Sequence, residues 1–89
     1  MAADRPGESG MTRTTAPYPG GRTVTYTSDD DLYVAKVRPT AEQGYFVVLV
    51  IAYLDSKFPY PVGTFRSESE ACDQARSRVK LYELEQRTE

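Results

Sequence analysis

The sequence of 89 residues contains no histidine, no tryptophan and only one cysteine, Cys72. A lone cysteine excludes a disulfide within the chain, and it cannot supply the four Cys or His ligands of a structural zinc site. Without histidine, no side chain titrates near neutral pH unless its surroundings shift its pKa. Because disulfides, metals and oligomerisation are the usual supports of small domains, we expect no metal, no cofactor and a homodimer.

The motifs of phosphate-binding enzymes are also missing, since the six glycines form neither a GxxxxGK[ST] nor a GxGxxG pattern. The acidic run at residues 29–31 is typical of a solvated turn, and adjacent solvated carboxylates are poor general acids. Cys72 falls on the apolar side of a predicted helix, where a free cysteine usually serves as a small buried side chain. The sequence therefore predicts a protein that is not an enzyme.

No apolar run is long enough to cross a membrane, because residues 44–54 fall far short of the roughly 20 residues required. The first 14 residues contain no apolar stretch of the kind found in secretory signals. Together with the unpaired cysteine, this predicts a cytoplasmic protein with no membrane contact.

Positive charge is not in excess. The net charge is −2, and from residue 23 onward eight Lys and Arg stand against eleven Asp and Glu. Because phosphate neutralisation supplies non-specific affinity for nucleic acids, nucleic-acid binding is not the leading expectation. The alternative hypothesis is a nucleic-acid-binding module that uses a local patch of Lys36, Arg38 and Arg66.

Composition divides the chain in two. Residues 1–22 are rich in Gly, Pro, Ser, Thr and Arg, which predicts a disordered amino-terminal tail. Residues 23–89 are predicted to form a single domain. Alternating or apolar segments bounded by turn residues predict its strands, at residues 22–27, 32–38, 45–54 and 58–65. The last of these must lie at a sheet edge, because Pro59 and Pro61 have no N–H to donate.

A helix is predicted from Ser67 onward. Ser67 and Glu70 have the spacing of a capping box, in which each side chain accepts from a backbone N–H of the first turn. Small and apolar residues then recur at steps of three and four, at Ala71, Cys72, Ala75, Val79 and Tyr82. The predicted fold is α+β: a three- or four-stranded antiparallel β-meander followed by one carboxy-terminal helix packed on one sheet face.

Residues 62–76, VGTFRSESEACDQAR, resemble the closing strand and helix start of small βββα modules. Such modules include the AP2/ERF DNA-binding domain and the arm-binding domains of tyrosine integrases. The resemblance implies the βββα fold, and it implies DNA contact through a strand, for which this chain offers Lys36 and Arg38. Similar small βββα proteins of bacteria and their phages act as accessory or inhibitor proteins that bind another protein. The matching residues are Gly63, Thr64, Phe65, Ser67, Glu70, Ala71 and Ala75.

The segment GYFVVLVIAYL at residues 44–54 is apolar on both sides of a strand, whereas a strand with one wet face alternates apolar and polar residues. One helix covers only one of these sides. The other could be covered by the amino-terminal part of the chain, with Tyr18, Val24 and Tyr26, by a second copy, or by a different protein.

We therefore expect a non-catalytic, protein-binding protein of the accessory or inhibitor type, such as phages encode, which contacts a partner or its own copy through the apolar sheet face or an edge. The partner can belong to a larger protein or nucleoprotein complex. Two leucines of the helix fall outside its apolar stripe and are added to the contact surface. The predicted partner-binding residues are Phe46, Val48, Val50, Leu54, Leu81 and Leu84.

Overall fold

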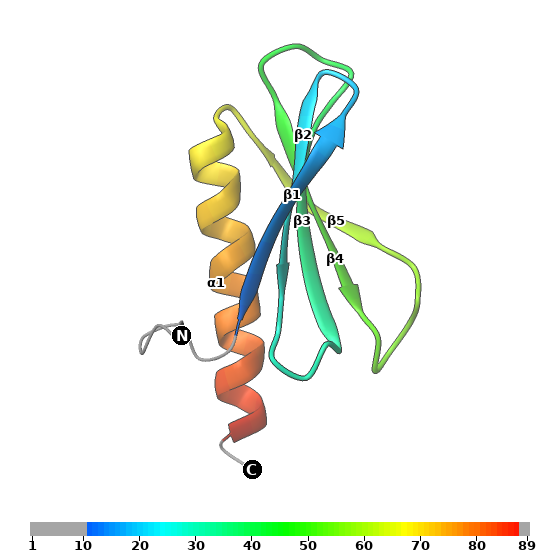
Figure 1. The fold of residues 1–89 in the computed structure, drawn as a ribbon, viewed down its shortest axis with the longest axis vertical. Coiled ribbons are helices and arrows are strands. Elements are labelled where there is room, and N and C mark those ends of the chain that lie inside the picture. The colour runs from blue at the N-terminus through cyan, green and yellow to red at the C-terminus, as the bar shows by residue number, and fades with distance from the viewer. Residues whose placement is uncertain (1–10, 88–89) are drawn as a thin grey trace.

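The computed structural model describes residues 11–87, which form one five-stranded antiparallel sheet and one helix (Figure 1). The strands follow one another across the sheet in the order β1-β2-β3-β4-β5. The predicted α+β fold, an antiparallel meander with a carboxy-terminal helix, is confirmed, with five strands in place of three or four. The elements are β1 (Thr12–Tyr18), β2 (Gly21–Thr27), β3 (Tyr33–Pro39), β4 (Phe46–Ala52), β5 (Tyr60–Phe65) and α1 (Glu68–Arg87).

The additional strand is β1, which lies within the segment 1–22 that composition predicted as a tail. Thr12–Tyr18 pairs with β2 along its whole length. The connecting turn holds Pro19 and Gly20, and Gly20 has a φ of 88°, as the third residue of a type II turn requires. Three β-branched threonines in β1 favour the extended conformation. The tail prediction is therefore wrong for β1, and residues 1–10 lie outside the described part of the chain.

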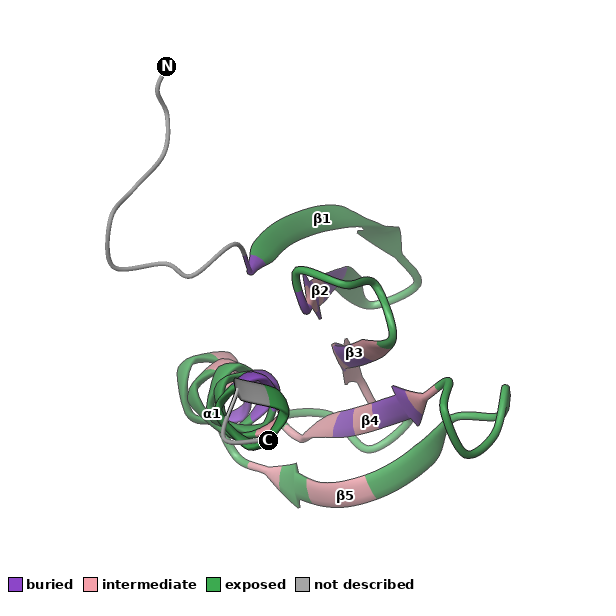
Figure 2. Ribbon diagram, turned by 90° about the horizontal axis from the view of Figure 1, so that it is seen from below, coloured by how far each residue is buried: buried purple, intermediate pink, exposed green. Residues whose placement is uncertain are grey.

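One face of the sheet, which we call the helix face, is covered by α1 (Figure 2). At its centre Val24, Val37 and Val48 lie side by side on β2, β3 and β4 and are fully buried. Small residues of α1 face them, which lets the helix approach the sheet closely. The predicted helical stripe is thus confirmed at its fully buried positions, Ala71, Ala75 and Val79.

The start of α1 is fixed by its cap and by one ion pair. Ser67 Oγ accepts a hydrogen bond from the Glu70 N–H at 3.1 Å, which is the serine half of the predicted capping box. The Arg22 guanidinium of β2 donates two hydrogen bonds of 2.9 Å to the carboxylate of Glu68. This pairing lowers the pKa of Glu68 and raises that of Arg22. The helix start is thereby tied to the end of the sheet near the β1–β2 turn.

The two edges of the sheet are β1 and β5. The prediction that the proline-containing strand lies at an edge is confirmed by β5. Its pairing with β4 shifts register between Val48 and Leu49, which is the irregularity of a β-bulge.

Candidate binding surface on the open face of the sheet

The second face of the sheet, which we call the open face, has no helix and no second sheet against it within residues 11–87. Successive residues of a strand point to opposite faces. In β4, Val48 and Val50 belong to the buried core beneath α1. Val47, Leu49 and Ile51 therefore point to the open face.

Six apolar residues form a continuous patch along β3 and β4 on this face. Register places Val34 opposite Ile51, and beyond them the Tyr53 N–H donates to the Leu32 carbonyl at 2.9 Å. Val34 and Ile51 are each only 8% exposed, whereas the flanking Tyr53 is 45% exposed. Burial on this face is therefore deepest at the Val34–Ile51 pair and falls toward Tyr53. We call the set the apolar strip: Leu32, Val34, Val47, Leu49, Ile51 and Tyr53.

Basic residues border the apolar strip, and no acidic residue lies on any described strand. Lys36 is opposite Leu49 and Arg38 is opposite Val47, so both basic side chains project on the open face. The described acidic residues lie instead in the turns and on α1. Although the chain is acidic as a whole, its open face is locally positive.

Two basic side chains pack on aromatic rings at the end of the sheet near the β1–β2 turn. The Arg38 guanidinium lies 5.0 Å from the ring centroid of Tyr18, and that of Arg66 lies 5.5 Å from that of Tyr45. Arg38 Nε is buried without a hydrogen-bond partner. The structure therefore brings Lys36 and Arg38 together on one face and adds Arg66 at the same end.

The predicted partner-binding residues of β4 do not lie on the open face. Val48 and Val50 are fully buried under α1, and Phe46 packs half-buried against the same core. The structure corrects the assignment of Val48 and Val50, because side chains with no exposed surface cannot contact a partner, and the assignment of Phe46 stays a prediction. The alternating pattern defines two sets of residues on β4, and the helix covers the set that we had assigned to the partner.

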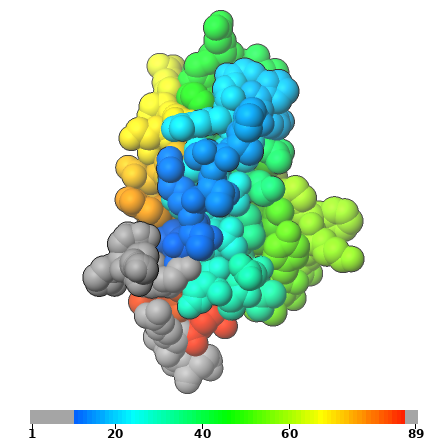
Figure 3. All heavy atoms as spheres, in the orientation of Figure 1, coloured from blue at the N-terminus to red at the C-terminus, as the bar shows by residue number. Residues whose placement is uncertain are grey.

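The three predicted leucines are exposed but do not share a surface. Leu54 is 62% exposed in the β4–β5 loop, and Leu81 and Leu84 are exposed on α1. Figures 1 and 3 show this loop projecting from the side of the molecule opposite to α1. Leu54 therefore adjoins the end of β4 beyond the apolar strip, and the helix leucines lie elsewhere.

The predicted partner-binding set contains none of the six residues of the apolar strip, although the predicted strands at residues 32–38 and 45–54 include all of them. In the structure Leu32 and Tyr53 lie one step beyond β3 and β4 and keep the alternation of those strands. Tyr18 was placed in the tail, and Tyr45 was read only as one of many apolar residues. Their pairing with arginines depends on register between strands, which the sequence does not display.

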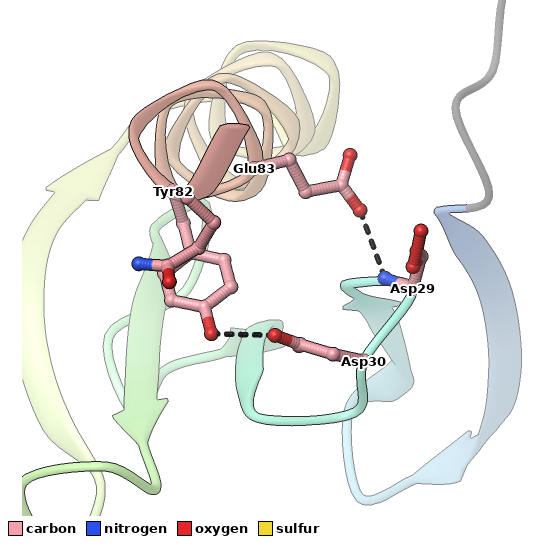
Figure 4. A pocket seen from close by; sticks show the side chains of 5 residues that line it. Asp29, Asp30, Tyr82 and Glu83 are labelled. Carbon is pink, nitrogen blue, oxygen red and sulfur yellow. Dashed lines mark hydrogen bonds between the residues drawn. The ribbon is translucent and has the colours of Figure 1, made fainter. Parts of the chain in front are cut away.

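A pocket between the β2–β3 turn and the end of α1 is a structural joint. The Tyr82 hydroxyl donates to Asp30 Oδ2 at 2.7 Å, and the Asp29 N–H donates to Glu83 Oε2 at 2.8 Å (Figure 4). Tyr82 also stacks on Tyr33, with ring centroids 4.8 Å apart. The predicted acidic turn therefore anchors the helix to the sheet.

Titration at this joint follows from its hydrogen bonds. The pKa of Asp30 is lowered because its carboxylate accepts from the Ser28 hydroxyl, at 2.7 Å, from the Leu32 N–H and from the Tyr82 hydroxyl. Desolvation and the hydrogen bond to Asp30 raise the pKa of Tyr82 to about 12. Both shifts favour the charge states that hold the joint together near neutral pH.

The other candidate sites carry no chemistry of their own. Cys72 is half-buried and packs against the core cluster. Between residues 11 and 87, no group of three or more Cys, Asp or Glu side chains is arranged to hold a metal ion. The helix of the described chain is not apolar enough to cross a membrane.

Comparisons of this chain with models of known protein families, with curated proteins and with solved structures found no match.

Proposed function

We propose that this chain is a non-catalytic binding protein, of the accessory or inhibitor type, whose open face contacts another protein. The supporting observation is the apolar strip, which occupies two central strands on a face that no other described element covers. Contiguous apolar surface of this kind usually marks an interaction site. Complete burial of an exposed large apolar side chain contributes about 1.5–3 kcal/mol, so each partly exposed member of the strip would contribute a fraction of this on binding.

The bordering charges specify the partner's chemistry. Lys36 and Arg38 project beside the apolar strip, and the strands offer no carboxylate to pair with them. Burial of unpaired charges is strongly unfavourable. The partner of the open face therefore presents an apolar centre flanked by acidic side chains. A second copy packed face to face does not satisfy this requirement.

The test is a pair of charge substitutions at Leu49, with Leu81 as the matched control. A partner is captured with the wild-type chain, identified, and its affinity measured with purified components. Leu49→Lys and Leu49→Glu should each weaken that complex at least about tenfold, which corresponds to about 1.4 kcal/mol, while Leu81→Lys leaves it unchanged. Equal affinity for the wild type and both Leu49 variants would contradict the proposal.

Nucleic-acid binding is the second candidate function, and one observation favours it. Lys36 and Arg38 project on the open face without a strand carboxylate, Arg66 lies at the same end as Arg38, and Tyr18 and Tyr45 supply rings on which bases can stack. Labelled single-stranded and duplex oligonucleotides at about 50 mM salt test it. For this function Leu49→Glu weakens binding and Leu49→Lys does not, so the sign of the charge separates the two candidates.

The chain acts without a cofactor, because binding through the open face requires none. A cytoplasmic location is consistent with the unpaired Cys72.

A further inference from the structure

We propose that two copies of this chain pair through the edge strand β1, antiparallel and centred on Thr15, so that their sheets join into one. The proposal concerns an edge of the sheet and does not depend on what binds the open face.

The hairpin register determines which backbone groups of β1 are unpaired. Tyr18 and Gly21 close the two-residue turn and form a hydrogen-bonded pair, and alternate residues of β1 bond to β2 in the same way. The same alternation continues across the sheet, where the Ser28 N–H donates to the Tyr33 carbonyl at 2.9 Å. The N–H and C=O groups of Arg13 and Thr15 therefore point away from β2.

This edge is accessible. Every residue of β1 is exposed. In Figure 2, β1 ends the row of strands with no described element beyond it, and in Figure 3 it lies at the molecular surface. An exposed row of unpaired N–H and C=O groups is a template for pairing with another strand.

The opposite edge is less suited to pairing. Beyond the register shift of β5, Pro61 is opposite Leu49 and its backbone points outward, and Pro59, just before the start of β5, has the same parity. Prolines at these positions remove the outward N–H donors. In β1 only Pro17 lacks an outward donor, and its carbonyl remains free to accept. The register shift of β5, together with Pro61 and the adjacent Pro59, makes self-pairing less favourable at β5 than at β1.

A two-fold axis at Thr15 gives a register without charge conflict. Thr15 faces Thr15 of the second copy, and these two residues exchange both hydrogen bonds of an antiparallel pair. Arg13 faces Pro17 of the second copy, so its N–H donates to a proline carbonyl and no like charges are opposed. The Arg13 Nε also donates to the Tyr26 hydroxyl at 3.3 Å, which holds the strand's only charge against its own sheet.

Wild-type protein provides the first test. In sedimentation equilibrium from micromolar to millimolar concentration, the mass should rise from 10.0 kDa toward twice that value. Hydrogen exchange at the Arg13 and Thr15 amides should slow over the same range, while the Thr14 amide, bonded to β2, is protected throughout. A monomer at every concentration overturns the proposal, as does dimerisation without added protection at Arg13 and Thr15.

Cysteine cross-linking tests the register, in a Cys72→Ala background. Thr15→Cys should form a covalent dimer on oxidation, because paired Cα atoms lie about 5.5 Å apart, within disulfide range. Arg13→Cys alone should not, because its two copies lie about 14 Å apart in this register. Mixing Arg13→Cys with Pro17→Cys should restore the cross-link. Equal cross-linking of Arg13→Cys and Thr15→Cys alone overturns the register.

Discussion

The helix face and the open face differ although β4 supplies apolar residues to both. On the helix face Val48 and Val50 are fully buried, and on the open face Leu49 is only half-buried. The difference arises on the neighbouring strand. In β3, Ala35 and Val37 point to the helix face.

The opposite side of β3 carries Lys36 and Arg38. A helix packed there would remove both charges from water, at a cost of several kcal/mol unless its own acidic side chains paired with them. When a strand is apolar on both sides, its own sequence does not determine which side is buried. The side chains of the neighbouring strands determine it, because register sets them beside one side or the other.

The largest expected effect comes from placing a charge on one side or the other of β4. Val50→Glu should destabilise the fold by about 4 kcal/mol or more, because it buries an unpaired charge under α1. Leu49→Glu, one residue away, should change the free energy of unfolding by less than about 1 kcal/mol, since its carboxylate faces Lys36 and solvent. Urea denaturation of both variants checks this. Equal destabilisation would mean that both faces are interior.

A smaller effect is expected from enlarging a residue of α1 where the helix contacts the sheet. Ala75→Leu adds volume at a fully buried position and should cost about 1–3 kcal/mol by overpacking. Gln74→Leu, on the exposed side of the same turn, is the control and should cost little. Thermal denaturation of the pair measures the difference, and a stabilised Ala75→Leu protein would show that the helix contact is loose.

The joint at the end of α1 should contribute about as much as one hydrogen bond. Tyr82→Phe removes the bond to Asp30 and keeps the ring stacked on Tyr33, so the free energy of unfolding should fall by about 1 kcal/mol. Tyr53→Phe, an exposed tyrosine on the open face, serves as the control. An unchanged free energy of unfolding in Tyr82→Phe would show that this hydrogen bond does not stabilise the fold.

The same joint predicts two pH limits. Because folding lowers the pKa of Asp30, its stabilisation is complete above the unfolded value of about 3.9 and is lost as pH falls through the lower folded value. Because folding raises the pKa of Tyr82 to about 12, its stabilisation holds below the unfolded value of about 10 and is lost as pH rises through the folded value. Asp30→Asn should flatten the acid limb of a stability profile, and Tyr82→Phe the alkaline limb.

The smallest effect concerns the exposed ion pair at the helix start. Glu68→Gln should reduce the free energy of unfolding by at most about 1 kcal/mol, because the Arg22 side chain is half exposed and solvent screens the pair. The loss should shrink at high salt. A loss that does not respond to salt would indicate packing instead of charge.

Much of the fold followed from local patterns. The Ser67 cap, the helical stripe and the edge position of β5 each depend on residues close together in sequence, so their spacing was sufficient. The strand β1 was missed because its exposed threonines and proline have the composition of a tail. Only pairing with β2 makes a strand of it, and pairing is not a local property.

The sequence predicts an apolar binding surface on the sheet, but it assigns that surface to the wrong side of β4. The two apolar sides of β4 are evident in the sequence, but Val48 and Val50, which the sequence assigns to the partner, lie in the core beneath α1. Lys36, Arg38 and Arg66 are distant in sequence; the structure places Lys36 and Arg38 on one face of the sheet and Arg66 at the same end as Arg38. Tyr18 and Tyr45 joined them only through strand register.

The sequence by itself determined that a helix follows a set of strands, that one strand would have two apolar sides, and that neither disulfide nor histidine chemistry supports the domain. These properties reside in composition and in periods of two and 3.6 residues. Tertiary structure alone decided which side of β4 the helix covers and that β1 extends the sheet. Both depend on the register between strands, because shifting a strand by one residue exchanges its two faces.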